Sequence, residues 1–372
     1  MRIGVNTRFL LKDKLEGLGW YTYQTLIRMV KHHPEDEFIF FFDRPFSNEF
    51  IFADNVKGVV LNPPARHPLL WYIWFDWVLP RSIRKYEIDV FYSPDGFLPK
   101  NSKAPTCLVM HDLAYAHYPE QINQSARKFY IKNVSKYLKS ADQIIAVSNA
   151  TKLDIIKQCN IDSQKIDVAY NGCRPAFKKA SSDLKLIRNK ISNGKPYFYF
   201  IGAIHPRKNV DKIVAAFNLF KKQSGLDHQL ILAGRMAWQT DAIEKAIESS
   251  PYKDEIILPG YLSTADAVHY MQAAFALVYP SLFEGFGVPV LEALHCEIPV
   301  ITSNTSSLPE VVGEAGILVD PTSALEIANA MQKLADEPSL RNQLIEHGKT
   351  QRNKFSWDKS AATIYSHLKK LL

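Results

Sequence analysis

Residues 281–301, SLFEGFGVPVLEALHCEIPVI, contain a glycine-broken loop between an apolar run and an amphipathic stretch. The residues that lead into it, 277–281 (LVYPS), have the composition of a buried strand and its exit. Gly285 and Gly287 allow the backbone to turn sharply, and Pro289 suits the first turn of a helix. A strand, a tight loop and a helix in this order predict one unit of a parallel α/β sheet.

The same alternation continues in both directions along the chain. Short strand-like runs include RIGVN, FIFFF, DVFYS, TCLVMHD and IIAVS in the first half, and YFYFIG, QLILAG, EIILPGYL, FALVYPS, PVITS and GILVD in the second half. Amphipathic stretches between them predict helices, for example over residues 20–31, 126–139 and 210–222. The pattern loosens into Lys- and Ser-rich sequence around 171–196, which predicts a domain boundary. We therefore expect two Rossmann-like α/β domains, residues 1–175 and 190–355.

Composition limits the class of protein. The 372 residues are 47% apolar and 22% charged, which is typical of a folded globular chain. The net charge of +7 is concentrated in residues 1–178, where 24 Lys and Arg face 18 Asp and Glu. Such an excess can attract phosphates, anionic lipid or nucleic acid, or simply be a solvated surface. The cysteines are scattered and no leader or bilayer-long apolar stretch is visible, so we expect a cytoplasmic protein without zinc or disulfides.

The opening stretch also carries two acids eight residues apart, Glu284 in the loop and Glu292 in the first part of the helix. The helix is expected to begin near Val288, with its unpaired N–H groups directed at the loop, where they favour an anion. Two carboxylates beside such a terminus suit a ligand that combines hydroxyls with phosphate, as sugar nucleotides do. Alternatively, Glu292 only complements the helix dipole and Glu284 is a loop charge.

The segment resembles the donor-site signature of retaining GT-B glycosyltransferases, the group called family four or group one. The resemblance covers 284–289 (EGFGVP), 292–293 (EA), 299–303 (PVITS) and 309–310 (PE). Other motifs agree in order, namely GLG at 17–19, HDL at 111–113, FIG at 200–202, PRKN at 206–209 and FSWDK at 355–359. The resemblance, which extends to bacterial polysaccharide mannosyltransferases, implies a GT-B fold. In that fold two Rossmann-like domains face each other across a cleft, and the C-terminal helix, residues 356–372, crosses back to the first domain.

The family assigns the lysine of the PRKN motif to the donor diphosphate, which implies this role for Lys208. Arg207 beside it could add a second fixed positive charge. Many relatives place an arginine directly after the glycine that ends the preceding strand, whereas this chain has Gly202 followed by Ala203. Either Arg207 supplies that charge or the phosphate is held less tightly; a basic turn on a solvated loop is the plain alternative.

The resemblance implies that Gly17 and Gly19 form a loop beneath the diphosphate, where a side chain would block close approach. It places His111, at the end of a predicted strand, close to the reacting sugar. A simple tight turn and a structural histidine are the alternatives for these positions.

Within the opening stretch, the resemblance implies that Glu284 binds hydroxyls of the transferred sugar. The backbone of Phe286, Gly287 and Val288 is expected nearby, and Glu292 is expected to hold the nucleotide ribose. The segment LPGYLS, residues 258–263, resembles the stretch that contacts the base.

These features predict a retaining hexosyltransferase that uses a nucleotide diphosphate sugar, with GDP-mannose as the leading candidate, and no nucleic-acid partner. No Asp-x-Asp motif is present in the chain, so we expect no metal and no cofactor besides the sugar nucleotide as co-substrate. The alternatives are a GT-B sugar phosphorylase, a nucleotide-sugar epimerase, or a catalytically degenerate partner subunit.

The acceptor is expected to be a saccharide or a lipid-linked saccharide. Residues 69–81 (LLWYIWFDWVLPR) are rich in aromatics and are followed by the basic residues Arg84 and Lys85. A later predicted helix adds Arg127, Lys128, Lys132, Lys136 and Lys139. Such a combination is typical of a headgroup interface, which suggests peripheral contact with the anionic inner face of the membrane. Alternatively, the aromatics pack the core and the lysines are solvated.

Overall fold

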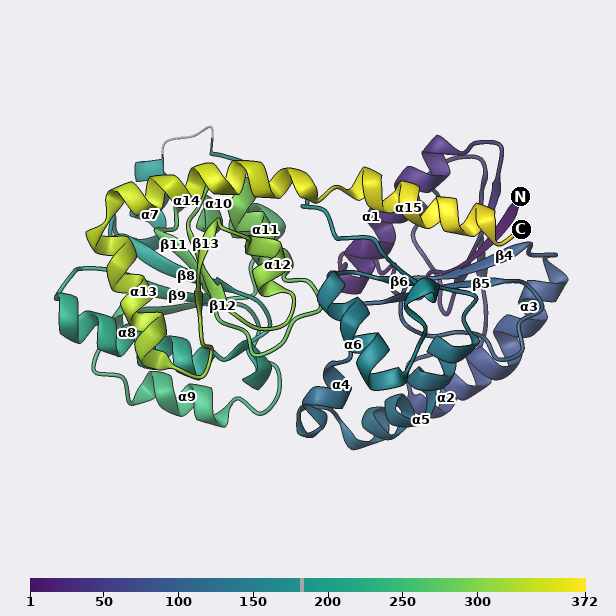
Figure 1. Ribbon diagram of the computed structural model, residues 1–372, viewed down its shortest axis with the longest axis horizontal. Coiled ribbons are helices and arrows are strands. Elements are labelled where there is room, and N and C mark those ends of the chain that lie inside the picture. Colours follow the sequence, from purple (N-terminus) through teal and green to yellow (C-terminus); the bar gives the residue numbers. More distant parts are fainter. Residues whose placement is uncertain (181–183) are drawn as a thin grey trace. The chain divides into compact units, whose positions relative to one another are not determined.

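Two parallel β-sheets, each in its own part of the chain, form the framework of the protein (Figure 1). The computed structural model describes residues 1–180 and 184–372. Its contacts divide the chain into unit 1, Met1–Asn171 with Ser356–Leu372, and unit 2, Gly172–Phe355. The division after Asn171 falls at the start of the stretch 171–196 in which the sequence placed the boundary. The predicted pair of Rossmann-like α/β domains is confirmed.

In unit 1, seven parallel strands follow the order β3-β2-β1-β4-β5-β6-β7. They are β1 (Arg2–Asn6), β2 (Glu37–Phe42), β3 (Val56–Val60), β4 (Val90–Ser93), β5 (Thr106–Met110), β6 (Gln143–Ala146) and β7 (Ile166–Val168). The main helices are α1 (Gly17–His32), α2 (Pro68–Ile73), the π-helical turn η2 (Trp74–Val78), α3 (Leu79–Lys85), α4 (Ala114–His117), α5 (Gln124–Ser140), α6 (Asn149–Cys159) and α15 (Trp357–Lys370). Central strands such as β2, EFIFFF, are buried along nearly their whole length, because helices cover both faces of a parallel sheet.

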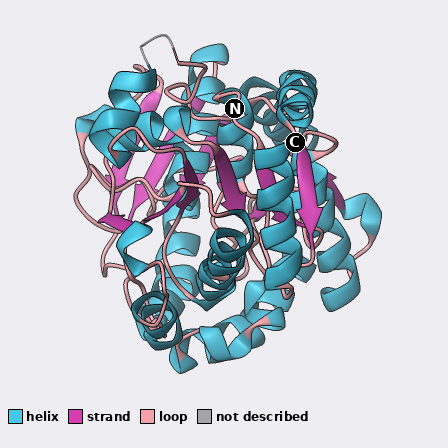
Figure 2. Cartoon of the chain, turned by 90° about the vertical axis from the view of Figure 1, so that its left-hand side faces the viewer, coloured by secondary structure: helices cyan, strands magenta, loops and turns pink. Residues whose placement is uncertain are grey.

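The described residues of unit 2 form six parallel strands in the order β10-β9-β8-β11-β12-β13. They are β8 (Tyr197–Ile201), β9 (Gln229–Ala233), β10 (Ile256–Gly260), β11 (Ala276–Tyr279), β12 (Val300–Ser303) and β13 (Gly316–Val319). The helices are α7 (Leu184–Ser192), α8 (Val210–Ser224), α9 (Asp241–Glu248), α10 (Thr264–Ala273), α11 (Val288–His295), α12 (Leu308–Val312), α13 (Ala324–Asp336) and α14 (Pro338–Gln351). Helices flank the parallel strands (Figure 2).

The strand orders locate where each sheet can bind a ligand. In unit 1 the connections reverse direction between β1 and β4, and in unit 2 between β8 and β11. At such a switch point neighbouring loops leave in opposite directions, and open α/β sheets bind ligands there, outside the carboxyl ends of the strands. In unit 2 the loops after β8 and β11 are therefore where a ligand site is expected.

Helix α15 belongs to unit 1 although it is the last element of the chain. It packs against α1 (Figure 1). Arg28 of α1 pairs with Asp358 at 2.9 Å, and the Tyr365 hydroxyl donates to Asp36 at 2.6 Å. The predicted C-terminal helix that returns to the first domain is thus confirmed.

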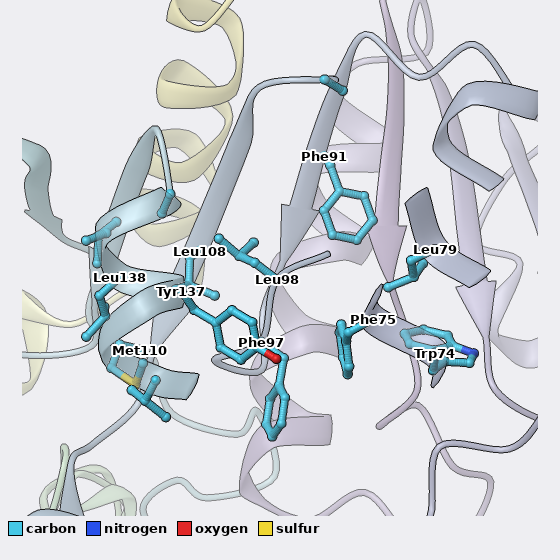
Figure 3. Close-up of a cluster of buried hydrophobic side chains, with 14 of the residues drawn as sticks. Trp74, Phe75, Leu79, Phe91, Phe97, Leu98, Leu108, Met110, Tyr137 and Leu138 are labelled. Atoms are coloured by element: carbon cyan, nitrogen blue, oxygen red, sulfur yellow. The ribbon is translucent and has the colours of Figure 1, made fainter. Parts of the chain in front are cut away.

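The aromatic run of residues 69–81 is helical and is divided between core and surface. Trp74, Phe75 and Leu79 are buried and point into the hydrophobic cluster of unit 1 shown in Figure 3. Leu69 and Trp77, by contrast, are 65% and 59% exposed. Core packing therefore accounts for only part of the run.

Candidate functional site

The loops after β8 and β11 meet at the switch point of unit 2 and bring Lys208 to Glu284. Lys208 ends the short 3₁₀ turn Pro206–Lys208, and Glu284 lies in the loop between β11 and α11. The Lys208 ammonium donates hydrogen bonds to the Glu284 carboxylate and, at 2.6 Å, to the hydroxyl of Tyr279. The Tyr279 hydroxyl lies 3.1 Å from the same carboxylate. All three side chains are buried.

Arg207 lies on the other side of the same carboxylate. Its guanidinium donates to the carbonyl of Phe283 at 2.6 Å and lies 3.6 Å from Glu284 Oε2. The chain thus places a second cation at this point, although Ala203 stands where many relatives have arginine. That Arg207 provides the charge for a bound phosphate stays a prediction.

Electrostatics fix the charge state of Glu284. Burial alone would raise the pKa of this carboxyl, but Lys208 and Arg207 outweigh it and lower the pKa to about 2. Burial and the Glu284 charge raise the pKa of Tyr279 well above its ordinary value, so its hydroxyl stays protonated. The site therefore presents an acid that is ionised at neutral pH beside two cations.

The loop from Glu284 to Gly287 is pinned by two serines. The Glu284 N–H donates to Ser306 Oγ at 3.1 Å. The carbonyl oxygens of Glu284 and Phe286 both lie 2.9 Å from Ser307 Oγ and share its single hydroxyl proton. Gly287 has a φ of +98°, and a Cβ there would lie 2.6 Å from Leu308 Cδ2, so this position requires glycine.

Helix α11 begins directly after this loop, at Val288, with Gly287 as its N-cap. The Phe286 side chain is buried and packs edge-on against Phe355, with ring centroids 5.4 Å apart. Phe286 is thus anchored in the core, and only its backbone is placed to take part in a site.

Glu292 has a different partner. It is 1% exposed, and its Oε1 accepts a hydrogen bond from Arg174 Nε at 2.6 Å. Burial raises the pKa of Glu292 even though Arg174 opposes the shift. The guanidinium of Arg174 also lies over the ring of Phe177, 4.5 Å from its centroid.

In unit 1 the predicted residues gather around the start of α1 and the end of β5. A Cβ on Gly19 would lie 2.7 Å from the Phe9 carbonyl oxygen, whereas one on Gly17 would meet no atom within 4 Å. His111 follows β5, with its Nε2 2.8 Å from the carbonyl oxygen of Pro94 and its ring edge-on to Tyr21. Burial lowers the pKa of His111, so its ring is neutral at pH 7.

Sequence reasoning did not identify four side chains that shape the unit 2 site: Tyr279, Arg174, Ser306 and Ser307. Asn209 is part of the PRKN motif quoted above, but its role was not predicted: it has a φ of +62°, and its amide donates to the carbonyls of Pro280 and Pro321 at 3.0 and 2.6 Å. It thereby ties the turn after β8 to the loop after β11. Asparagine tolerates the left-handed region, so its place before a predicted helix is a signal that could have been used.

Comparison with known proteins supports this fold. The family described as Glycosyltransferase Family 4 matches residues 16–177, and the family described as Glycosyl transferases group 1 matches residues 183–351. O-antigen chain mannosyltransferase B of Escherichia coli is 28% identical over 94% of both chains. Serotype-specific mannosyltransferase WbdA of Escherichia coli is 26% identical over 69% of this chain, which spans about a third (32%) of that protein's length.

Two solved structures have the same fold. Sucrose-phosphate synthase from Thermosynechococcus elongatus superposes with a TM-score of 0.80 at 18% identity, covering 100% of this chain and 98% of that one. HepE of Anabaena in complex with UDP-glucose superposes with a TM-score of 0.75 at 18% identity, covering 100% of both chains.

Proposed function

The chain belongs to the glycosyltransferases of group 1 and family 4, and on that premise we propose that it transfers a hexose from a nucleotide diphosphate sugar to a hydroxyl of a saccharide or lipid-linked saccharide. One observation carries this proposal: the Lys208–Glu284 pair, with Arg207 beside it, at the switch point of unit 2. Fixed cations suit a diphosphate, and an ionised carboxylate accepts hydrogen bonds from sugar hydroxyls.

The electrostatics suit the bond that must break. During transfer, the bond between the anomeric carbon and the diphosphate oxygen is cleaved, and its electron pair stays on the leaving diphosphate. Negative charge on that group is therefore greater in the transition state than in the bound donor. Lys208, Arg207 and the N-terminus of α11 favour the more highly charged state, which lowers the barrier.

We assign retention of configuration to this reaction, as the family resemblance implies. The acceptor oxygen bonds to the anomeric carbon on the face that the diphosphate leaves, and the hydroxyl proton passes to a leaving phosphate oxygen. Glu284 in this scheme binds sugar hydroxyls rather than forming a covalent bond. Glu292 holds the ribose, and the backbone from Phe286 to Val288 lies along the donor.

The positive charge needed by the diphosphate is present in Lys208 and Arg207 themselves. We therefore propose that the reaction does not depend on a bridging divalent cation. Mannose is the proposed sugar and GDP-mannose the proposed donor, on the basis of the similarity to O-antigen chain mannosyltransferase B. The product would be part of a cell-surface polysaccharide or glycolipid, assembled at the cytoplasmic face of the membrane.

The direct test incubates the full chain with GDP-mannose and, separately, with UDP-glucose, and measures nucleoside diphosphate release with and without oligosaccharide acceptors. NMR of the product gives the anomeric configuration. Acceptor-dependent release and a retained configuration support the proposal. Turnover with inorganic phosphate as acceptor would indicate a phosphorylase, turnover with water alone an epimerase or hydrolase, and no turnover with any donor a degenerate subunit.

A further inference from the structure

An exposed apolar stripe runs along the helical segment of α2, η2 and α3 in unit 1. Leu69, Ile73 and Trp77 follow one another at intervals of four residues and are 65%, 39% and 59% exposed. Arg81 continues the stripe, with its guanidinium 5.3 Å from the Trp77 ring centroid. A stripe of large apolar side chains on the solvent side of a helix indicates a surface that contacts something else.

Helix α5 lies beside this segment and extends the same surface. The Asn133 amide donates to the Tyr72 hydroxyl at 3.0 Å, and Trp71 packs edge-on against Phe129 with centroids 4.9 Å apart. Lys132 lies with its ammonium 5.6 Å from the Tyr72 ring, and Ile131 next to it is 58% exposed. Figure 1 shows α2 and α5 as neighbours in unit 1. We call the exposed side of these helices the α2–α5 face.

The charge of the α2–α5 face has one sign. The exposed basic residues on these helices and just before α2 are Arg66, Arg81, Arg84, Lys85, Lys128, Lys132, Lys136 and Lys139. Among residues 66–85 and 124–140 the sequence has a single acid, Asp76. That carboxyl is partly buried, and burial raises its pKa although Lys100 and Lys132 oppose the shift. The face therefore combines apolar side chains with a strong positive field.

This combination identifies the partner. A second copy of the chain bound through the same face would bring two sets of cations together, because a two-fold interface pairs a surface with itself. An anionic bilayer instead offers headgroups for the lysines and arginines and an acyl boundary for leucine, isoleucine and tryptophan. Tryptophan backed by arginine is suited to the boundary between headgroups and acyl chains.

We propose that the α2–α5 face is the surface by which this protein binds an anionic phospholipid bilayer, with α2, η2 and α3 lying in the plane of the interface. The contact is peripheral; among the described residues, no helix is sufficiently long and apolar to cross a membrane. Binding through this face needs neither sugar donor nor acceptor, so it stands or falls independently of the proposed transferase activity.

The test uses co-sedimentation of the full chain with vesicles of phosphatidylcholine alone or mixed with phosphatidylglycerol, at low and high salt. We expect binding to the mixed vesicles only, and weaker binding at high salt. The variant Lys128→Glu/Lys132→Glu should lower the partition coefficient by more than tenfold, since each basic residue near an anionic surface contributes about fivefold. The variant Leu69→Ser/Trp77→Ser should lower it by about tenfold or more.

Matched controls come from unit 2, where Leu325 is 53% exposed and Lys222 and Lys245 are exposed. Leu325→Ser and Lys222→Glu/Lys245→Glu change the same chemistry elsewhere and should bind as the wild type does. Circular dichroism checks that each variant folds, and the lysine variant decides the question if the apolar variant does not fold.

Three results would overturn the proposal. One is an absence of binding to the mixed vesicles at low salt. Another is binding that both α2–α5 variants leave unchanged. The third is self-association without lipid that these variants abolish, because the face would then be an interface between protein copies.

Discussion

Replacing Lys208 with methionine tests how strongly the two charges of the candidate site depend on each other. The substitution keeps much of the side-chain volume and removes the ammonium that donates to Glu284 and Tyr279. Glu284 then remains buried with Arg207 at 3.6 Å as its nearest cation. Burial disfavours the charged carboxylate and Lys208 is the strongest influence that opposes it, so we expect the pKa of Glu284 to rise.

The size of the effect follows from the pKa of Glu284, which is about 2 in the folded chain against an ordinary value of 4.5. This difference corresponds to about 3 kcal/mol of stability at pH 7. Because the folded-state pKa is the lower one, that stability is present above about pH 4.5 and is lost as the pH falls toward 2. We expect Lys208→Met to lose about 3 kcal/mol at pH 7. The difference in unfolding free energy between the wild type and the variant should narrow as the pH falls from about 4.5 toward 2, where the folded wild type also protonates Glu284.

Hydrogen exchange in increasing urea, read by mass spectrometry on peptides from β8 and β11, measures the free energy of opening in unit 2 itself. Lys222→Met, on the exposed side of α8, is the matched control and should change it little. The double variant Lys208→Met/Glu284→Gln removes both charges and should be more stable than Lys208→Met alone. If the two single losses simply add in the double variant, the charges are not coupled and the reasoning is wrong.

Further predictions concern binding, turnover and the loop. Glu292→Ala should weaken nucleotide binding in isothermal titration by about 10- to 100-fold, whereas Glu284→Ala should mainly lower kcat, because we assign one acid to the ribose and the other to the sugar. Arg174→Met should destabilise unit 2 by about 3 kcal/mol at pH 7, because it leaves the Glu292 carboxylate buried without its cation. The loss of stability should be smaller at pH 5, where Glu292 in the variant can take up a proton; equal losses of stability at both pH values would contradict this. Activity should persist in EDTA, and full dependence on added magnesium or manganese would refute metal independence. Gly287→Ala should cost about 1–3 kcal/mol in urea unfolding, and wild-type stability would show that the loop relaxes.

The sequence predicted the central strands well because both faces of a parallel sheet are buried. Runs such as YFYFI in β8 are therefore continuously apolar and easy to recognise. The edge strands β3 and β7 were missed, since VKGVV and IDV are only partly buried and carry a weak apolar signal. Helix α1 begins at Gly17 rather than at the predicted residue 20. The prediction began later because Gly17 and Gly19 are poor helix formers, so the local sequence indicates a loop.

The residues of the candidate site that belong to sequence motifs were predictable, and the residues outside those motifs were not. Lys208 follows β8 and Glu284 follows β11, and these two strands pair with each other. The topology alone therefore brings their loops together. Tyr279 accepts a hydrogen bond from Lys208, but in the sequence it is indistinguishable from the apolar residues of its strand. Tyr279 is the last residue of β11, so it lies where the sheet ends and the loop with Glu284 begins. Its hydroxyl therefore reaches Glu284.

The two acids of the opening stretch show most clearly what spacing cannot convey. Glu284 and Glu292 are the same residue type, yet neighbouring cations lower the pKa of the first while burial raises that of the second. The cation beside Glu292 is Arg174, which lies 118 positions earlier in the chain, directly after the division between the units. A ribose that reaches Glu292 must therefore share the carboxylate with Arg174 or displace its guanidinium. If Glu292 holds the ribose as we propose, nucleotide binding depends on the segment that leads into unit 2, and the E-x7-E pattern by itself does not contain this dependence.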